Sequence, residues 1–236
     1  MDQLACEHVA ALAATASVAT VSIWATRAHS GAWILPFSRG LAVLVLAAYL
    51  TENVAIVVRG TWSLERSLPL QLTDAVTIIA ALALWSPRPL LFELAYFWAL
   101  TASLQAVLTP DLDSAFPSLF FFTYFTTHGG AVVAALFLAL GRGLVPRQGA
   151  VLRVFLATVA FAALAGLADL LTGGNYMFLR EKPEAASLLD LMGPWPWYLL
   201  SGALLAIAMF AALDAPFRAR RRDRGSWSRG HSTGIP

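Results

Sequence analysis

Ionisable side chains recur inside long apolar stretches of this sequence. His128 lies in the block 118–140, and Glu52, Asp74 and Asp169 lie in three other apolar blocks. Charged groups are expensive in hydrocarbon, so such positions predict a functional site when the blocks cross a membrane. Imidazole titrates near neutral pH, which suits His128 to general acid or base catalysis. The structural alternative for His128 is a hydrogen bond between helices.

The blocks that carry these residues are long enough to cross a membrane. A helix needs about 20 apolar residues to span the hydrocarbon core, and seven blocks approach that length: 8–26, 40–58, 67–85, 89–108, 118–140, 151–171 and 195–213. Of the 236 residues, 58% are hydrophobic and 13% are charged, against roughly 25% charged in soluble domains. This composition excludes a water-soluble enzyme, a nucleic-acid-binding domain and a disordered chain. It predicts an all-α bundle of seven transmembrane helices.

The basic residues predict how the bundle is oriented. With the N-terminus outside, twelve of the 16 Lys and Arg fall on the cytoplasmic side, as positive-inside topology requires. Residues 1–217 then form the membrane domain, and residues 218–236 form a basic cytoplasmic tail. After Asp223 the tail is rich in glycine and serine, which is typical of disorder. We therefore predict a multi-pass protein of the cell membrane.

In this orientation the polar side chains of five blocks fall at one depth, in the outer half of the membrane. The set comprises Glu52, Asn53, Gln71, Thr73, Asp74, Gln105, Thr123, Thr126, Thr127, His128 and Asp169. Gln71 and Asp74 are three residues apart and share one helix face. The inner half holds mainly Glu93, for which Arg88 is the predicted ion-pair partner. A layer at one depth predicts a polar cavity that opens to the outside.

Each of these side chains also has a structural interpretation. The three outer carboxylates are possible ion-pair partners of Arg59 or Arg66, and a threonine such as Thr73 commonly bonds back to its own helix. The other histidines lie outside the polar layer, and the single cysteine, Cys6, is expected to be inert near the terminus. No metal site and no cofactor is therefore predicted.

The connection 172–194 is unusually long for a link between two helices, which favours a functional role. It contains the glycine-rich and aromatic stretch 173–179 and ends in Gly-Pro-Trp-Pro-Trp-Tyr at 193–198. Two prolines and three aromatic residues predict a rigid interfacial start for the last helix. Asn175, Tyr176, Trp195 and Trp197 are accordingly candidate substrate-binding residues.

Six stretches carry a resemblance to a known family, and they occur in this order: LPLQLTD at 68–74, LTPDL at 108–112, HGG at 128–130, GNYMFL at 174–179, KPE at 182–184 and LDLMGPWPWY at 189–198. Over about residues 52–198 the chain resembles the bacterial YwaF-type membrane proteins, which are grouped with the eukaryotic TMEM164 family. The resemblance implies a seven-helix fold. For the eukaryotic branch it implies acyl transfer onto phospholipids through a membrane cysteine. The more distant androgen-induced fatty-acid-ester hydrolases are similar in using a threonine with a histidine.

The chain departs from the family at the nucleophile. Members often carry His-x-Cys where this sequence has Gln71-Leu72-Thr73, and Cys6 does not match that position. Either Thr73 replaces the cysteine, with His128 as base, or catalysis has been lost.

Our leading hypothesis is a lipid acyltransferase or acyl-ester hydrolase. An activated hydroxyl needs a base that a third group orients. In this hypothesis Thr73 attacks an acyl ester, His128 removes its proton, and Asp74, Glu52 or Asp169 orients the imidazole. Gln71 or Asn175 donates to the oxyanion; Glu52, Asn53, Gln105, Asp169, Tyr176, Trp195 and Trp197 complete the predicted substrate-binding set.

Two other classes of protein fit the same polar layer. One is a transporter or binding protein for a small polar or lipid-headgroup solute, since intramembrane carboxylates also serve proton coupling. The other is a scaffold subunit that binds a partner helix. The expected partners are membrane lipids, including an acyl donor, and not nucleic acid. The sequence does not define the substrate or the oligomeric state.

Overall fold

The structure is a computed structural model that describes residues 5–29, 31–112, 114–183 and 188–231, with side chains as far as Arg218. Its elements are α1 (Cys6–Ala28), α2 (Ile34–Val58), α3 (Leu72–Trp85), α4 (Pro89–Trp98), the π-helix η1 (Ala99–Ser103), α5 (Leu104–Leu108), α6 (Leu119–Leu136), the π-helix η2 (Phe137–Gly141), α7 (Ala150–Thr172), the short 3₁₀ helices η3 (Tyr176–Phe178) and η4 (Leu188–Met192), and α8 (Trp197–His231). The described part of the chain contains no strand. The predicted all-α class is confirmed.

Six helical segments are long and apolar enough to span a membrane. In two of them a π-turn continues the helix, so α4, η1 and α5 form one span and α6 and η2 form another. The seventh apolar helix, α3, has only 14 residues. At 1.5 Å per residue it is about 21 Å long, shorter than a hydrocarbon core of about 30 Å. The predicted block 67–85 is therefore helical only from Leu72 onward.

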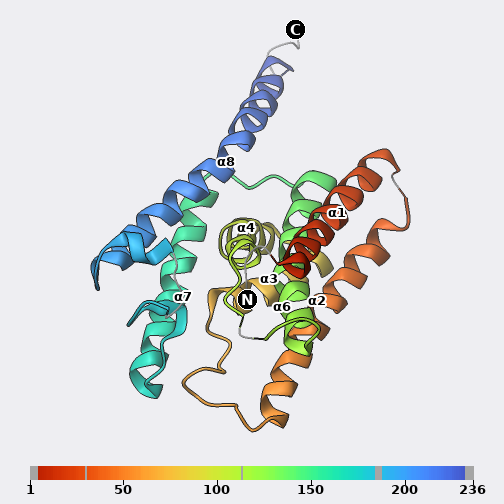
Figure 1. The fold of residues 1–236 in the computed structure, drawn as a ribbon. Coiled ribbons are helices and arrows are strands. Elements are labelled where there is room, and N and C mark those ends of the chain that lie inside the picture. The colour runs from red at the N-terminus through yellow and green to blue at the C-terminus, as the bar shows by residue number, and fades with distance from the viewer. Residues whose placement is uncertain (1–4, 30, 113, 184–187, 232–236) are drawn as a thin grey trace.

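Figure 1 shows α3, α4 and α6 between α1 and α2 on one side and α7 and α8 on the other. The central helices bury their side chains most completely: Leu84 of α3, Phe97 of α4 and Ala134 of α6 are fully buried. The Trp98 indole N–H donates to the Thr158 hydroxyl over 2.8 Å and joins α4 to α7. The apolar core therefore lies around α3, α4 and α6.

Helices α2 and α6 pack antiparallel in a regular register. The Glu52 carboxyl lies within reach of the Thr123 hydroxyl, and the rings of Phe37 and Phe137 are 5.1 Å apart at the other end. Between these contacts, a Cβ placed on Gly130 would lie 2.5 Å from a Val45 methyl. Small residues allow such close approach of membrane helices.

Helix α3 is recessed relative to α2. The Ser38 hydroxyl donates to the Leu84 carbonyl over 2.6 Å, so these two residues are level. Leu72 lies twelve residues before Leu84 and is therefore level with Leu50, twelve residues after Ser38. Helix α2 continues for eight further residues to Val58, or about 12 Å at 1.5 Å per residue. The N-terminal end of α3 therefore begins well below the end of α2 on the side that the arginine distribution predicts to be outside.

The opposite end of the bundle holds a buried ion-pair cluster. The Glu93 carboxylate is fully buried and lies 2.9 Å from both the Arg147 Nε and the Arg153 Nη2. The prediction that Arg88 pairs with Glu93 is wrong. Arg88 is nearest in the sequence, but the fold brings two arginines to Glu93 from beyond α6. The bond to Glu93 also raises the pKa of Arg147, which lies in the loop before α7.

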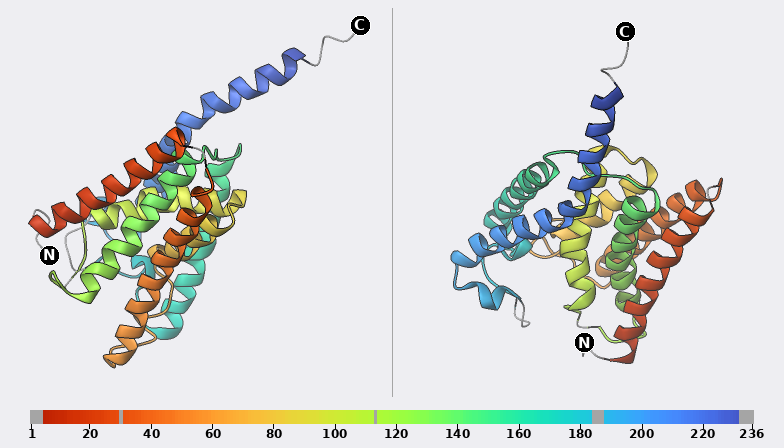
Figure 2. Two further views of the ribbon diagram at one scale, coloured as in Figure 1. Left: turned by 90° about the vertical axis from the view of Figure 1, so that its right-hand side faces the viewer. Right: turned by 90° about the horizontal axis from the view of Figure 1, so that it is seen from above.

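The last helix, α8, projects beyond the other helices at its C-terminal end (Figure 2). It is helical from Trp197 to His231 with Pro216 inside it. The division at residue 218 between a membrane domain and a disordered tail stays a prediction, and its residues 232–236 lie outside the described residues.

Candidate functional site

The segment 173–179 fills the recess at the N-terminal end of α3. Gly173 ends α7 with φ 80°, the left-handed conformation that glycine adopts readily. A Cβ on Gly174 would lie 2.6 Å from the Glu65 carbonyl oxygen, so the segment runs directly against the α2–α3 loop. Met177 and Phe178 both have φ 55°, which is uncommon for residues with side chains. The surrounding contacts hold this strained backbone in place.

Side-chain hydrogen bonds satisfy the backbone of this segment. Asp169 Oδ1 accepts the Tyr176 N–H over 2.7 Å, and Gln71 Oε1 accepts the Met177 N–H over 2.9 Å. The buried Tyr176 hydroxyl donates to the Leu64 carbonyl over 2.8 Å and accepts the Leu68 N–H over 2.9 Å. Non-helical backbone at membrane depth is tolerated only where protein groups satisfy it. These bonds therefore explain how an irregular segment can lie there.

The last aromatic motif holds the same segment from the other side. The Tyr198 hydroxyl donates to the Phe178 carbonyl over 2.6 Å, and the Trp195 indole N–H donates to the Leu179 carbonyl over 3.2 Å. Trp195 and Trp197 are otherwise 62% and 63% exposed, as is usual for tryptophans of the interfacial belt.

Both the oxygen and the nitrogen of the Asn175 side-chain amide form hydrogen bonds near the segment. Its Oδ1 accepts the N–H groups of Arg180 and Glu181, and its Nδ2 donates to the Glu181 carbonyl. One of the two amide N–H groups of Asn175 is therefore engaged next to its own segment.

A second group of polar residues lies between α2, α3 and α6. Glu52 and Asp74 lie near each other, and both lie near Tyr49. Asp74 Oδ2 accepts the Gln71 N–H over 3.2 Å at the start of α3, where the helix dipole favours a negative charge. Within the described residues, neither carboxylate has an ion-pair partner.

Neither Arg59 nor Arg66 forms an ion pair with these carboxylates among the described residues. The Arg59 guanidinium lies 4.4 Å from the centre of the Phe120 ring, in a cation–π contact. Asp169 is buried, and its Oδ2 has no hydrogen-bond partner among the described residues.

His128 is held in one tautomer. Its Nδ1 lies 2.9 Å from the Tyr124 carbonyl oxygen, which can only accept, so Nδ1 carries the proton in the neutral ring. Its ring stacks on Tyr124 with 4.2 Å between centroids. The remaining nitrogen, Nε2, carries the lone pair and makes no hydrogen bond within the described part of the chain. His128 therefore presents the form of imidazole that accepts a proton.

The Thr73 hydroxyl lacks the bond to its own helix that seven threonines of the helices make, a lack that it shares with Thr126. The hydroxyls at 15, 26, 77, 101, 127, 158 and 172 all donate to carbonyls four residues earlier in their own helices. Thr73 is the second residue of α3, and Pro69, four residues earlier, lies outside the helix. The expected bond to its own helix is therefore absent, and the Thr73 hydroxyl has no partner in the part that the structure describes.

Thr73 and His128 lie at one depth on neighbouring helices. Helices α3 and α6 pack together, and each has a defined register against α2. The α2–α3 register places Asp74 beside Tyr49. The α2–α6 register places Tyr49 level with Thr126. Thr73 and His128 therefore share a layer, although they form no direct hydrogen bond.

One predicted binding residue does not join either group: Gln105 is exposed and donates to the Thr109 hydroxyl of its own helix end over 2.6 Å. Asn53 adjoins the second group, because it donates to the Tyr49 carbonyl over 2.9 Å.

Sequence reasoning did not include two tyrosines of the layer, Tyr49 and Tyr124. Their signal is helical spacing: Tyr49 lies three residues before Glu52, and Tyr124 lies four before His128. Residues at these separations meet on one helix face.

The apolar spans and internal polar groups define a polytopic helical membrane protein. Comparison with known families then gives its relationship: the model of the TMEM164 family matches residues 3–214, and the chain belongs to that family. The chain is also similar to an uncharacterized protein of Treponema pallidum (strain Nichols), with 29% identity over 186 residues, which cover 78% of this chain and 76% of the relative. No solved structure matches.

Proposed function

We propose that the protein is a lipid acyltransferase or acyl-ester hydrolase that works from the outer leaflet. The observation that carries this proposal is the layer shared by Thr73 and His128. A hydroxyl without a hydrogen bond and an imidazole Nε2 with a free lone pair lie at one depth on packed helices. These are the two groups that nucleophilic acyl transfer requires.

The reaction follows from these groups. Thr73 Oγ1 attacks the ester carbonyl as His128 Nε2 takes the hydroxyl proton. The tetrahedral intermediate collapses to an acyl-threonine, and the alcohol leaves with the proton from Nε2. Water or the hydroxyl of a second lipid then attacks the acyl-threonine by the same exchange of one proton. The Tyr124 carbonyl keeps the ring oriented throughout because it binds Nδ1–H.

The oxyanion needs hydrogen-bond donors near Thr73. Gln71 supports this role because only its Oε1 is engaged, by Met177, which leaves its NH₂ group as a donor. Asn175 is less suited, since its amide is bonded within its own segment. The first turn of α3 adds main-chain N–H groups and a positive helix end.

Family membership supports acyl transfer as the class of reaction, whereas the choice of Thr73 as nucleophile rests on the site alone. The chain belongs to the TMEM164 family, and the resemblance to the eukaryotic branch implies acyl transfer onto phospholipids.

The test is lipid analysis of membranes that contain the wild type, Thr73→Ala or His128→Ala. The wild type should change the acyl composition, and both variants should lose that change. Thr77→Ala is the matched control, because Thr77 lies one turn along α3 and its hydroxyl is bonded to the Thr73 carbonyl. An acyl composition that is the same in all four membranes would refute the proposal.

A second candidate, a proton-coupled transporter, is favoured by Glu52 and Asp74, which have no cationic partner among the described residues. Unpaired intramembrane carboxylates are typical of proton relays. Uptake into proteoliposomes that depends on a proton gradient, and that Asp74→Asn or Glu52→Gln abolishes, would establish transport. At the other end of the bundle, Arg147 and Arg153 each form two side-chain hydrogen bonds with Glu93. This cluster argues against an open exit for a solute at that end.

A further inference from the structure

Ser103 carries a buried hydroxyl that the reaction of Thr73 and His128 leaves unused. It lies in the π-helix η1, within the span formed by α4, η1 and α5, and is 1% exposed. Its Oγ has no hydrogen-bond partner among the described residues. An unpartnered polar group inside a protein costs free energy, and such groups are rare. The presence of this hydroxyl therefore indicates a role for it.

The π-turn explains why Ser103 does not bond to its own helix. Thr101, two residues earlier in the same turn, donates to the Phe97 carbonyl over 2.7 Å. The corresponding carbonyl for Ser103 is that of Ala99, which accepts the Leu104 N–H in the wider turn. Single π-turns within α-helices are frequent at functional sites. The Ser103 hydroxyl is thus left to bond a group outside its own span.

Ser103 lies on the face of its span that packs against α3 and α6. The π-helix η1 contacts both of these helices. Ala99, Ser103 and Val107 follow one another at intervals of four residues and are all buried, so they share one face. Val107 packs against Phe121 and Phe125 of α6. The Ser103 side chain is therefore directed between the spans and not toward lipid.

Ser103 is level with the start of α3. Helix α3 ends at Trp85 and α4 begins at Pro89, so a short connection joins two antiparallel neighbours. Thr73 lies 12 residues before Trp85, and Ser103 lies 14 residues after Pro89. At 1.5 Å per residue, both are roughly 20 Å from the connection. Ser103 therefore shares the depth of Thr73.

The contacts of α6 lead to the same layer. The Tyr124 hydroxyl donates to the Ala106 carbonyl over 2.9 Å, so these residues are neighbours on two packed spans. One turn further toward the inner side, His128 follows Tyr124 on α6, and Ser103 precedes Ala106 on the antiparallel span. The His128 ring stacks on Tyr124 and so lies on the same side of α6. His128 Nε2 and the Ser103 hydroxyl therefore lie in one layer on facing sides of the two spans.

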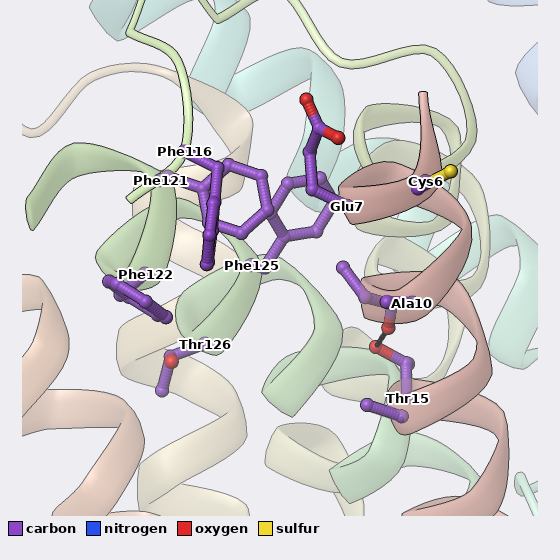
Figure 3. Close-up of a pocket in the computed structure, with 11 residues that line it drawn as sticks. Cys6, Glu7, Ala10, Thr15, Phe116, Phe121, Phe122, Phe125 and Thr126 are labelled. Atoms are coloured by element: carbon purple, nitrogen blue, oxygen red, sulfur yellow. Dashed lines mark hydrogen bonds between the residues drawn. The ribbon is translucent and has the colours of Figure 1, made fainter. Parts of the chain in front are cut away.

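Three other hydroxyls near this depth are bonded or face elsewhere. The hydroxyls of Thr127 and Thr15 each donate to a carbonyl four residues earlier, and the dashed line in Figure 3 marks the bond of Thr15. Thr126 makes no such bond, but Figure 3 shows it among the side chains that line a groove between α1 and α6. Ser103, in contrast, lies between α3 and α6.

We propose that Ser103 relays the proton between Thr73 and His128, a role that rests on the proposed function. As Thr73 Oγ1 attacks the ester carbonyl, its proton passes to Ser103 Oγ, and the Ser103 proton passes to His128 Nε2. When the tetrahedral intermediate collapses, Nε2 returns a proton to Ser103 Oγ, which gives its own to the leaving alcohol oxygen. Ser103 thus holds one proton before and after each step. The relay accounts for a nucleophile and a base that share a layer without a direct hydrogen bond.

The test is the rate of acyl transfer by the full chain in vesicles of phosphatidylethanolamine and phosphatidylglycerol. Each lipid carries deuterated acyl chains in turn, and mass spectrometry follows these chains into the other lipid or into free fatty acid as the fraction of labelled lipid is varied. Ser103→Ala should lower kcat by about 100-fold, as for loss of a proton-transfer group. KM should stay unchanged, because the relay acts only in the transition state.

Two variants control this measurement. Ser103→Thr keeps a hydroxyl at the position and should retain most of the rate. Thr101→Ala removes a hydroxyl from the same π-turn that is bonded to its own helix, and should leave the rate unchanged. An Ser103→Ala protein as active as Thr101→Ala would overturn the relay. So would a folded Ser103→Thr protein as inactive as Ser103→Ala, or a loss of activity through KM alone.

Thermal unfolding separates a relay from a structural role. Because Ser103 Oγ has no hydrogen bond to lose among the described residues, Ser103→Ala should unfold at the temperature of the wild type or higher. A lower unfolding temperature would show that the hydroxyl stabilises the fold and would overturn the relay. If Ser103→Thr does not fold, kcat and the unfolding temperature of Ser103→Ala decide.

The outcome is separable from that of the proposed function. Activity that Thr73→Ala and His128→Ala abolish but Ser103→Ala retains would refute the relay and leave the proposed reaction. Absence of acyl transfer by the wild type would refute the proposed reaction, and the relay with it.

Discussion

Gln71 and Met177, more than one hundred residues apart in the sequence, are joined by a hydrogen bond of 2.9 Å from the Met177 N–H to the Gln71 side-chain oxygen. Gln71 caps the recessed end of α3, and Met177 lies in the irregular segment that fills the recess. The pair therefore fixes the position of Thr73, two residues from Gln71. The segment 173–179 therefore influences the proposed reaction by positioning the start of α3.

Tyr176→Phe should destabilise the protein by about 1–3 kcal/mol, because it leaves the Leu68 N–H and the Leu64 carbonyl without the partner that both now share. Thermal unfolding in detergent measures the effect. Trp197→Phe, at an exposed position, should change the unfolding temperature little. Equal unfolding temperatures for Tyr176→Phe and the wild type would show that this hydroxyl does not hold the segment.

Tyr176 also predicts a pH dependence. Burial, followed by the charges of Asp169, Asp74 and Glu65, raises the pKa of Tyr176 above its ordinary value of 10.0. Since the folded state then holds the phenolic proton more tightly than the unfolded state, this contribution to stability is complete below pH 10.0 and is lost as the pH rises toward the folded pKa. Above pH 10.0 the wild type should therefore lose stability more steeply than Tyr176→Phe. Unfolding measured from about pH 8 to about pH 11, in steps of roughly one unit, checks this.

The helices were predictable because they follow from local composition. The start of α3 was not: residues 67–71 are apolar enough to continue a span, and only Pro69 suggests a break. Their backbone is non-helical because Tyr176, from a distant segment, satisfies it. The partners of Glu93 were missed for the same reason, since Arg147 and Arg153 meet it only through the fold. The sequence likewise could not show that Asp169, Gln71 and Asn175 bind main-chain groups, because those groups are about six to one hundred residues away.

Gly130→Ala should separate α2 from α6. The added Cβ would lie 2.5 Å from a Val45 methyl, and overpacking of this kind costs about 1–3 kcal/mol. Gly202→Ala is the matched control: nothing lies within 4 Å of its Cβ position, so alanine should be neutral or stabilise α8 by about 0.5–1 kcal/mol. Unfolding temperatures of both variants give the comparison. A Gly130→Ala protein as stable as Gly202→Ala would contradict the close α2–α6 register.

The ion-pair cluster around Glu93 gives a prediction that distinguishes the partner seen in the structure, Arg153, from the partner expected from the sequence, Arg88. Arg153→Ala should destabilise the protein by about 1–3 kcal/mol, because it removes two hydrogen bonds from the buried Glu93 carboxylate. Arg88→Ala should leave stability unchanged within about 0.5 kcal/mol, as for an ordinary surface position. Denaturant unfolding of the two variants distinguishes them, and a larger loss for Arg88→Ala would restore the pairing expected from the sequence.

Thr73→Cys tests whether the side chain at position 73 is the nucleophile, since the family resemblance implies a cysteine there. If Thr73 is the nucleophile, the thiol should also form an acyl intermediate, now a thioester, because His128 Nε2 is available as base in the same layer. A thioester is cleaved by neutral hydroxylamine, so the acyl group should be released from Thr73→Cys by that reagent and retained by the wild type. Thr73→Cys in a Cys6→Ser background excludes acylation of the natural cysteine, which is exposed. Absence of hydroxylamine-sensitive acylation in this double variant, with the fold intact by thermal unfolding, would remove position 73 from the proposed chemistry.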